Sequence, residues 1–519
     1  MMNTESLSRR FAHKILSTQE VLSRVGAFPR EKRVTMCHGT FDVVHPGHLR
    51  HLLYAKGKGE ILVVSLTADR HISKGELRPH VPQDLRAANL AAYELVDYVI
   101  IDENPTPIEN IRSLKPDFFV KGFEYTSGSP NPRTEEERLE VSAYGGQMIF
   151  SPGDFVLSSS RLIRSAPPDI RFERLLSLME RYDISFDSLR STVAGMREMN
   201  VCVLGDTIID SYTRCSMIGG QTKTPTISVL FESLDHYVGG AGVVAKHLAA
   251  AGAKVNFVTM LGDDALGEFA LADLEAAGIE VQAIVETNRP TTDKNAIVVD
   301  QYRLLKVDTL DNRPVGPEVV QKFQAALATR SRDIQVFSDF RHGIFHKGSV
   351  AALTSGVPSD VLKVADSQVA SRWGNITEFM HFDLITPNER EARFALGDQD
   401  SNLRSLASLL YERAQCKYLI LKLGERGSMT YKEDNPRDLG GYFLLDSFTT
   451  SPTDPVGAGD ALLAYASLAL RVSESIEQAS ILGSIAAACE CEVDGNVPIT
   501  AETVRARIDA IEKAANYLS

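Results

Sequence analysis

The feature that most constrains this chain is an alternation of short apolar runs with helix-patterned stretches, which occurs in two separate series. The apolar runs of the first series are Arg33–Asp42, Glu60–Arg70, Tyr98–Glu103, Asp117–Gly122 and Gly146–Pro152. Between them lie stretches typical of helices, such as Gly47–Lys58 and Gln83–Val96. Near-continuous apolar strands that alternate with helices indicate a parallel sheet covered on both faces. We therefore predict an α/β domain over residues 33–165.

The second series predicts a larger α/β domain over residues 199–519. Its apolar runs are Asn200–Asp206, Val255–Gly262, Ile334–Phe340, Val361–Gln368, Phe382–Asn388 and Tyr418–Gly424. Two stretches rich in Thr, Val and Ile, residues 213–238 and 284–308, interrupt the alternation at strand-like spacing. We expect these two stretches to form a small β-lid.

The remaining segments are short, and a chain of 519 residues is too long for a single core. Residues 1–32 are expected to form an N-terminal helical extension without the apolar core of a secretory signal. Residues 166–198 are expected to be a linker that carries a helix over Arg171–Tyr182. Two domains with a connecting segment are therefore predicted.

Composition excludes several classes of function. The net charge of −13 argues against a general nucleic-acid binder, which needs a basic face. No run of about 18 apolar residues occurs, so we expect no membrane span. The six cysteines have neither a disulfide framework nor a zinc spacing. We therefore expect a reduced, cytoplasmic protein.

The first motif follows the first predicted strand and opens the first predicted helix. It reads His38-Gly39-Thr40-Phe41-Asp42-Val43-Val44-His45-Pro46-Gly47-His48. Ligands of open parallel sheets bind beyond the carboxyl ends of the strands, where a helix N-terminus attracts phosphate. Two histidines three residues apart on one helical turn lie on the same side and can donate to one phosphate group. His45 and His48 are therefore the candidate catalytic residues of this domain.

The second motif, Asp454-Pro455-Val456-Gly457-Ala458-Gly459-Asp460, precedes a long apolar helix over Ala461–Leu470. A Gly-Ala-Gly turn that enters a helix presents backbone N–H groups to an anion. Asp460 is placed to take the proton from an attacking hydroxyl while that cradle holds a phosphoryl group. The chain contains no Walker A motif, so it does not resemble a P-loop ATPase.

Residues 33–165 resemble the cytidylyltransferase-like nucleotidyltransferases, and in particular the adenylyltransferase domain of the bifunctional heptose-phosphate kinase/adenylyltransferases of ADP-heptose synthesis. Besides the HxGH motif, the resemblance rests on Arg78-Pro79, Arg86, Val120–Tyr125 and Ser158–Ile163. It implies a Rossmann-like sheet and the nucleotide- or phosphate-binding residues Gly39, Thr40, Phe41, Arg86, Lys121, Ser159 and Ser160. Taken singly, these serines are typical of helix N-caps and Arg86 of a surface charge.

Residues 199–515 resemble the ribokinase-like (PfkB) carbohydrate kinases, which implies Asp460 as the catalytic base. The matching residues are Gly205-Asp206, Asp210, Gly239–Ala241, Gly262–Asp264, Gly267, Asp339, Pro387-Asn388, Glu391, Lys422, Gly424, Gly427 and Asp454–Asp460. By resemblance, the anion hole and ATP side comprise Gly457, Ala458, Gly459, Asn388, Glu391, Lys422, Gly424 and Gly427. The sugar side comprises Asp206, Asp210, Gly239, Gly240 and Lys294. No direct protein cage for a metal is expected, because Mg²⁺ would be held through phosphates, with Glu391 on its side.

Three departures from the heptose kinases fall in the sugar pocket. Val243 stands where those enzymes have Asn, and Ala296 where an Arg is typical. Asp366-Ser367-Gln368 replaces an Asp-Pro-Lys pattern. Loss of an amide, an Arg and a Lys indicates a sugar with less negative charge, or with its phosphate placed differently.

The two resemblances together imply a bifunctional enzyme that makes a nucleotide-activated sugar, most simply ADP-D-glycero-D-manno-heptose from heptose 7-phosphate. In those bifunctional enzymes the kinase domain comes first, so the domain order here is reversed. Val120–Tyr125 favours ATP over CTP as nucleotide donor, and both reactions would need Mg²⁺. A homodimer through the kinase lid is expected by resemblance.

Two alternatives remain open. One is a cytidylyltransferase for an alditol or other sugar phosphate, fused to a different PfkB-type kinase. The other is a nucleotidyltransferase with a non-catalytic, sugar-sensing or dimerising kinase-like module. The presence of the candidate base Asp460 argues against this second alternative.

Overall fold

The computed structural model describes residues 7–518 except 45, 73–78, 123–131, 152–170, 221–226, 301, 329–330, 369–374, 433–440 and 494. The chain divides into two compact units, the first formed by Met1–Asp183 and the second by Ile184–Lys513. Each unit is described by itself below.

The first unit is built on a five-stranded parallel sheet. Its strands are β1 (Val34–Gly39), β2 (Ile61–Thr67), β3 (Tyr98–Asp102), β4 (Phe118–Lys121) and β5 (Gln147–Phe150). Their order is β3-β2-β1-β4-β5, and every neighbouring pair is parallel. Each strand lies within one of the five predicted apolar runs, so the predicted α/β class is confirmed for this unit.

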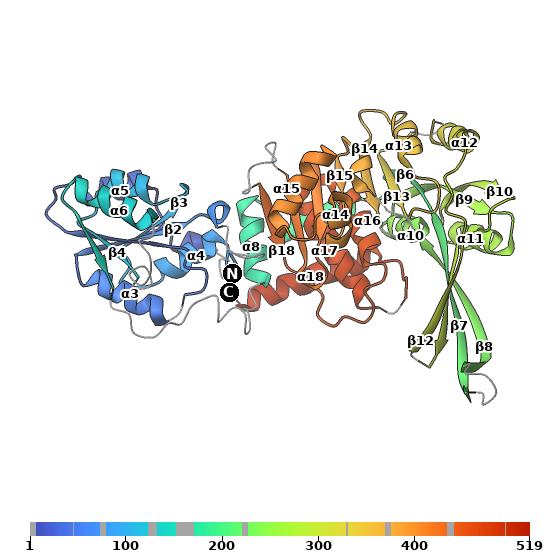
Figure 1. The fold of residues 1–519 in the computed structure, drawn as a ribbon, viewed down its shortest axis with the longest axis horizontal. Coiled ribbons are helices and arrows are strands. Elements are labelled where there is room, and N and C mark those ends of the chain that lie inside the picture. Colours follow the sequence, from blue (N-terminus) through green and yellow to red (C-terminus); the bar gives the residue numbers. More distant parts are fainter. Residues whose placement is uncertain are drawn as a thin grey trace. The chain divides into compact units, whose positions relative to one another are not determined.

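Helices cover both faces of this sheet (Figure 1). They are α2 (Thr18–Val25), α3 (Pro46–Lys56), α4 (Gln83–Ala91), α5 (Ile108–Leu114) and α6 (Pro132–Ala143). One core cluster contains Leu52 of α3 and Leu90 of α4, and the other contains Val21 of α2, Ile111 of α5 and Val141 of α6. The short α1 (Leu7–Arg10) precedes them. The predicted N-terminal extension thus contributes α2 to the core of the first unit.

Two helices, not one, occupy the predicted linker. The expected helix is α8 (Arg171–Arg181), which belongs to the first unit, whereas α9 (Phe186–Gly195) belongs to the second. Ser185 begins α9 with a capping box, because its hydroxyl accepts from the backbone N–H of Ser188. The units therefore divide after Asp183, between the two helices.

The second unit contains a nine-stranded sheet in the order β10-β9-β6-β13-β14-β15-β16-β17-β18. The six predicted runs correspond to the strands β6 (Asn200–Gly205), β9 (Lys254–Gly262), β13 (Ile334–Asp339), β14 (Leu362–Ser367), β15 (Leu384–Ile385) and β16 (Tyr418–Lys422), of which β9 begins one residue before its run. Three further strands were not predicted, namely β10 (Glu280–Glu286), β17 (Ser428–Tyr431) and β18 (Tyr442–Leu445). The sheet is parallel from β10 to β16, and β17 and β18 extend it antiparallel.

A separate four-stranded sheet forms the predicted lid and projects away from the body of the second unit (Figure 1). Its strands are β7 (Thr207–Gly220), β8 (Ile227–Gly240), β11 (Asp293–Val299) and β12 (Tyr302–Thr309). The predicted second lid stretch, residues 284–308, begins too early, because residues up to Glu286 belong to β10 and pair with β9 in the main sheet. Strand composition alone does not distinguish the two sheets.

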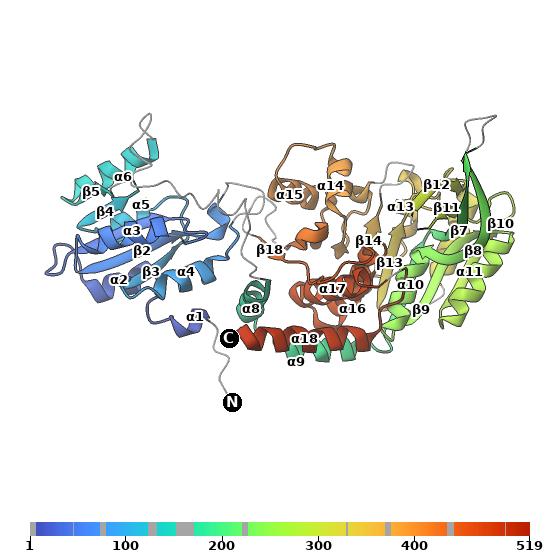
Figure 2. The same cartoon turned by 90° about the horizontal axis from the view of Figure 1, so that it is seen from below.

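The helices of the second unit flank its main sheet (Figure 2). They are α10 (Ala241–Ala250), α11 (Ala265–Ala276), α12 (Pro317–Ala328), α13 (Lys347–Thr354), α14 (Glu389–Leu396), α15 (Leu403–Ala414), α16 (Ala458–Ser473), α17 (Ile476–Cys491) and α18 (Ala501–Leu518). Most residues of α16 and α17 are buried, which agrees with their predominantly apolar sequences. In the part of the chain that the structure describes, no helix has the length and apolarity to cross a bilayer.

Two glycines after β16 give a matched test of this fold. Gly424 and Gly427 both have positive φ, 62° and 82°. A Cβ at Gly427 would lie 1.9 Å from the carbonyl oxygen of Leu445, whereas a Cβ at Gly424 meets nothing within 4 Å. Gly424→Ala should cost roughly 1–2 kcal/mol of stability for the left-handed backbone alone, and Gly427→Ala clearly more. Thermal unfolding of both variants measures the difference, and equal melting temperatures would contradict the packing of β17 against β18.

Candidate active sites

In the first unit, the loop that follows β1 brings the HxGH segment to the carboxyl end of the sheet. β1 ends at Gly39, and Phe41 turns the chain with a positive φ of 48°. The rings of Phe41 and His48 lie 5.3 Å apart, which joins the loop to the first turn of α3. A Cβ at Gly39 would lie 3.1 Å from the Phe41 ring, so glycine allows this close packing. His45, Ser159 and Ser160 lie outside the described residues.

Arg86 of α4 is fully buried and holds this loop. Its Nε donates to the carbonyl oxygen of Val81, and one amino nitrogen donates to that of Thr67, both at 2.9 Å. The guanidinium also reaches the carbonyl oxygen of Thr40 and the carboxylate of Asp69, each at 2.5 Å. In this arrangement Arg86 fixes the backbone around Thr40. Its contact with a phosphate, which the resemblance implied, stays a prediction.

Lys121, at the end of β4, lies beside a carboxylate that the sequence analysis did not identify. Its Nζ is 3.2 Å from Thr134 Oγ1 and forms an ion pair with Glu137, both on α6. The side chains of Lys121 and Glu137 are only 9% and 7% exposed. Burial raises the pKa of Glu137, and the nearby Lys121 ammonium opposes the shift. Lys121 is thus a buried cation held in place at the predicted phosphate-binding edge.

His38 is a further polar residue at this edge. Its Nδ1 is 2.9 Å from Ser65 Oγ, and its Nε2 is 3.2 Å from Thr67 Oγ1. Asp102 approaches Nδ1 at 3.7 Å. Burial and the charge of Lys121 lower the pKa of His38 to about 3, so the ring is neutral at physiological pH. His38 is part of the sequence motif, but its partners lie on β2 and β3 and are identified only by the structure.

In the second unit, Asp460 lies in the first turn of α16 and is 9% exposed. The helix begins after Gly457, whose φ of 85° favours glycine. A Cβ at Gly457 would lie 2.9 Å from both Glu490 Oε1 and Asn496 Oδ1, and one at Gly459 would lie 3.2 Å from Lys422 Nζ. The glycines therefore allow side chains to pack directly against the predicted anion hole.

Lys422, at the end of β16, connects the residues predicted for the ATP side. Its Nζ is 3.1 Å from both carboxylate oxygens of Asp366. Asn388 and Glu391 form the capping box of α14: the Asn388 side chain accepts from the Glu391 N–H at 2.8 Å, and the Glu391 carboxylate accepts from the Asn388 N–H at 2.6 Å. Residues Asn388 and Lys422 also form a parallel bridge. Asp366 was named in the sequence only as the retained first residue of the altered Asp-Pro-Lys pattern, and its role as the partner of Lys422 was not predicted.

The carboxyl groups of this site repel one another. Burial, followed by the charge of Asp366, raises the pKa of Asp460 to about 8. Burial likewise raises the pKa of Glu391 to about 7 and that of Glu490 to about 8. Burial alone would lower the pKa of Lys422, but the carboxylates of Asp366 and Glu391 raise it. The site therefore combines a permanently charged Lys422 with acids that hold protons near neutral pH.

The residues predicted for the sugar side meet where the lid joins the main sheet. Lys294 lies opposite Asp210 in the parallel pairing of β11 with β7. A Cβ at Gly239 would lie 2.1 Å from Asp210 Oδ2, so the carboxylate occupies the space that glycine leaves. Asp206 is 3% exposed and accepts from the backbone N–H of Phe340 at 3.0 Å. The charge of Asp210 also contributes to the raised pKa of Asp460, which links the sugar side to the predicted base.

The three departures occupy buried or partly buried positions. Val243 of α10 and Ala296 of β11 are 2% and 8% exposed. The N–H of Gln368 donates to the carbonyl oxygen of Asp339 at 2.8 Å. Neither Val243 nor Ala296 can form side-chain hydrogen bonds, so the polar contacts expected of a heptose kinase are absent at these positions.

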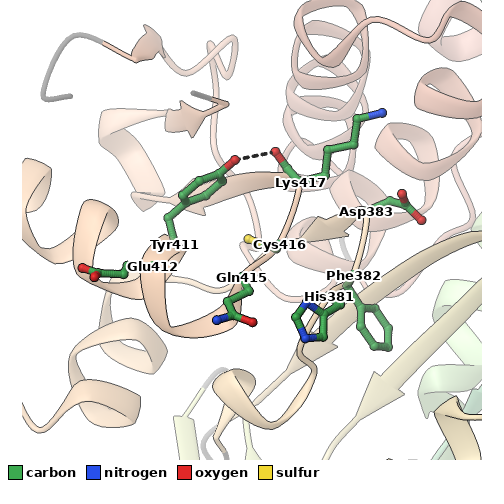
Figure 3. A pocket seen from close by; sticks show the side chains of 8 residues that line it. All are labelled: His381, Phe382, Asp383, Tyr411, Glu412, Gln415, Cys416 and Lys417. Carbon is green, nitrogen blue, oxygen red and sulfur yellow. Dashed lines mark hydrogen bonds between the residues drawn. The ribbon is translucent and has the colours of Figure 1, made fainter. Parts of the chain in front are cut away.

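A pocket of about 490 Å³ lies at the opposite end of the main sheet (Figure 3). Its lining comprises residues 381–383, which directly precede β15, and residues 411, 412 and 415–417, which precede β16. Asp366, Asn388 and Lys422 instead lie at the carboxyl ends of strands or just beyond them. The pocket therefore does not belong to the candidate active site.

Comparison with known proteins shows the family. The model described as "pfkB family carbohydrate kinase" matches residues 198–501, which is more than half of the chain. The model described as "Cytidylyltransferase-like" matches residues 36–165. The chain therefore belongs to the pfkB family of carbohydrate kinases and carries a cytidylyltransferase-like segment ahead of the kinase. Both predicted resemblances, and the predicted order along the chain, are confirmed.

Similar curated proteins bear the name "Bifunctional protein HldE". The one from Geobacter metallireducens is 26% identical over 308 residues, which cover 58% of this chain and 61% of the relative. The one from a Bradyrhizobium species is 28% identical over 338 residues, covering 62% and 65%. The chain thus spans less than two thirds of the length of these relatives. A crystal structure of phosphofructokinase-2 from Escherichia coli shares the fold over 61% of this chain and 99% of its own, with a TM-score of 0.50 and 16% identity.

The raised pKa of Asp460 predicts a pH-dependent effect on stability. Its carboxyl has a pKa of about 8 in the folded protein and 3.8 ordinarily, so its stabilising contribution is complete below about pH 4 and is lost as the pH rises through about 8. Asp460→Asn removes the buried charge and should raise the melting temperature at about pH 9, with little effect near pH 4. Calorimetry across this range, with exposed Asp263→Asn as control, measures the effect. A lower melting temperature for Asp460→Asn at about pH 9 would contradict the assignment.

Proposed function

We propose that the chain is a bifunctional enzyme that phosphorylates a sugar in its second unit and transfers a nucleotidyl group to a sugar phosphate in its first. The observation that carries the proposal is the arrangement of Asp460 at the start of α16, beside Lys422, whose side chain is 14% exposed. This arrangement has the parts that phosphoryl transfer needs, namely a proton acceptor, backbone donors at a helix N-terminus and a fixed cation. The family matches to both units support the same conclusion.

In the proposed kinase reaction, Asp460 accepts the proton of the sugar hydroxyl that attacks the terminal phosphorus of ATP. The N–H groups at Gly457–Gly459 stabilise charge on the transferring phosphoryl oxygens. Lys422, held by Asp366, is proposed to neutralise charge on the ATP side. Because a pKa of about 8 leaves much of Asp460 protonated at neutral pH, ionisation of this base is favoured by cations that arrive with the nucleotide.

Mg²⁺ is proposed to enter with the polyphosphate. Within the described ranges, no group of three or more His, Cys, Asp or Glu side chains could hold a metal ion by itself. The buried Glu391 carboxylate, fixed by Asn388 next to Lys422, fits the metal–phosphate side of such a complex. When bound, the ion would neutralise phosphate charge and orient the transferring group.

In the proposed transferase reaction, His48 donates to the phosphate oxygens of a nucleoside triphosphate and a sugar phosphate displaces pyrophosphate. His45, Ser159 and Ser160 are assigned to the same nucleotide by resemblance. Lys121, fixed by Glu137, is proposed to attract the phosphates at the carboxyl edge of the sheet. Of ATP and CTP, we propose ATP as donor, because Val120–Tyr125 is similar to the adenylyl branch.

The two reactions form a sequence in which the kinase supplies a phosphate-bearing acceptor for the transferase. The proposed product is a nucleotide-activated sugar, with heptose 7-phosphate as the first starting compound to test; formation of ADP-heptose from it also requires a separate phosphatase that removes the 7-phosphate by hydrolysis between the two reactions. Val243 and Ala296, which carry no polar side-chain groups, are the reason to test other sugar phosphates beside it. Mass spectrometry of reactions with a panel of sugars, sugar phosphates, ATP and CTP would identify the substrates.

We also propose that two copies of the chain associate through the lid. More than half of the exposed large apolar side chains in the described part of the chain lie on β7, β8 and β12. They include Phe231 at 60% and Tyr302 at 70% exposure. An exposed apolar surface of this extent on a projecting sheet is typical of an interface. A second copy is the proposed occupant, because the same surface would then cover itself by two-fold symmetry.

Two single substitutions should separate the proposed activities. Asp460→Asn should lower sugar-dependent ADP formation by roughly 10²–10⁴-fold, because the proton acceptor is lost, and leave pyrophosphate release from a supplied sugar 1-phosphate unchanged. His48→Ala should have the reverse effect, with a loss of about 10²–10³-fold in pyrophosphate release. Coupled assays for ADP and pyrophosphate measure both. Normal phosphorylation by Asp460→Asn would refute its role as base.

The dimer is tested by a charge placed on the lid. Phe231→Asp should shift the protein from dimer to monomer. In the dimer the aspartate carboxylate would be removed from water and placed against an apolar surface, which is unfavourable. Val497→Asp, which places the same charge on a side chain that is 49% exposed outside the lid, is the control and should remain dimeric. Sedimentation velocity measures the mass of each. A monomeric wild-type protein at micromolar concentration would contradict association through the lid.

A further inference from the structure

His342 is a buried histidine whose ring has no hydrogen-bond partner among the described residues. The residue is 3% exposed, and neither Nδ1 nor Nε2 forms a hydrogen bond there. A neutral imidazole has one donor and one acceptor, and buried polar groups of native proteins are nearly always paired. Two unpaired nitrogens in one buried ring therefore indicate that the partner is a molecule that the chain binds.

The position of His342 places its ring on the sugar side of the candidate kinase site. The residue lies in the loop after β13, at the carboxyl edge of the main sheet. Its backbone N–H is 3.3 Å from Oδ2 of Asp206, a residue assigned to the sugar side. The charge of Lys294, assigned to the same side, acts on the ring. His342 thus belongs to the cluster where the lid joins the sheet.

The loop that carries His342 is held firmly. Asp339 accepts from the backbone N–H of Arg341 at 2.8 Å and forms an ion pair with its guanidinium at 2.9 Å. Arg341 has a positive φ of 60° and also pairs with Glu378 at 3.1 Å. At Gly343, φ is 114°, and a Cβ would lie 2.6 Å from the carbonyl oxygen of Arg313. These contacts fix the backbone on both sides of the histidine, so its ring is positioned in advance of any ligand.

The charge state of the ring limits the kind of ligand group that it can contact. Burial and the charge of Lys294 lower the pKa of His342 to about 4. A neutral ring pairs well with hydroxyl groups, which both donate and accept, and provides no positive charge for a phosphate. Phosphate recognition is left to cations such as Lys294.

We propose that His342 is a specificity-determining residue of the sugar site, where its two ring nitrogens form hydrogen bonds with hydroxyl groups of the sugar. One nitrogen donates and the other accepts. This inference rests on the proposed kinase function. It supplies a donor and an acceptor in a site where Val243 and Ala296 lack them, and it favours a polyhydroxylated sugar over a deoxy analogue.

The test compares the full-length protein with two variants at this position. His342→Leu should raise the KM for the sugar substrate by about 10-fold or more, with a smaller change in kcat and an unchanged KM for ATP. Its melting temperature should stay the same or rise, because an apolar side chain replaces an unpaired polar ring. His342→Asn, which keeps one donor and one acceptor, should recover part of the lost affinity. A purely structural histidine would instead give a lower melting temperature without a selective change in sugar KM.

His346→Asn is the control. His346 also has an unpaired Nε2, but its Nδ1 accepts from the Gly348 N–H at 3.2 Å as the cap of α13. Asn can keep this cap, so the sugar KM should stay at the wild-type value. The probes are heptose 7-phosphate and a panel of hexose and pentose phosphates with their deoxy analogues. If the wild-type protein turns over a probe and His342→Leu has the same sugar KM as the wild type, this inference alone is overturned. If the wild-type protein turns over none of the probes, the proposed function is overturned as well.

Discussion

The second unit depends on one buried cation. Lys422 is held between carboxylates at the carboxyl edge of the nine-stranded sheet, and Asp366 contacts it with both oxygens. A charge that is largely removed from water, like that of Lys422 with its side chain 14% exposed, is stabilised by opposite charges beside it. Burial raises the pKa of Asp460 to about 8; the charges of Asp366 and Glu391 add to this shift, and the charge of Lys422 opposes it. Structure and chemistry are therefore coupled through a single group of charges.

The first unit also contains buried cations, but each is stabilised by a different set of groups. Lys121 is buried beside Glu137 of α6. Arg86 of α4 is also buried and donates hydrogen bonds to backbone carbonyl groups. One cation is thus paired with a carboxylate, and the other is used to hold the loop after β1. His38 stays neutral near Lys121 because protonation would add a second buried positive charge. In both units the cations at the sheet edge are fixed by groups that lie on other elements.

Much of the fold was predictable, because buried parallel strands consist of short apolar runs that can be recognised in the sequence. The five strands of the first sheet and the six central strands of the second follow such runs. β17 and β18 were missed, since two short antiparallel strands after β16 have no helix between them. The second lid stretch was begun too early because β10 has Val and Ile at the spacing typical of a strand, as the lid strands do. Composition indicates a strand but does not state which sheet it joins.

The sites were predictable only where the motif itself carries the chemistry. Asp460 and its glycines are adjacent in sequence, but Asp366 is 56 residues from Lys422 and has no motif that links the two. Glu137 stands in a strongly charged helix, where nothing in the sequence separates the buried partner of Lys121 from exposed neighbours. His342 required knowledge of burial. Such pairings are set by tertiary packing, which no local spacing encodes.

The position of β6 in the second sheet has a consequence for how the chain folds. β6 lies between β9 and β13, and its first residue, Asn200, donates to Asp333, which is 133 residues further along the chain. In the first unit the comparable contact, from Val34 to Asp117, spans 83 residues. Closing a longer loop costs more chain entropy and slows the formation of non-local pairs. During synthesis the first sheet can therefore close before β6 pairs with β13, and the edge of β6 that faces β13 stays unpaired for longer.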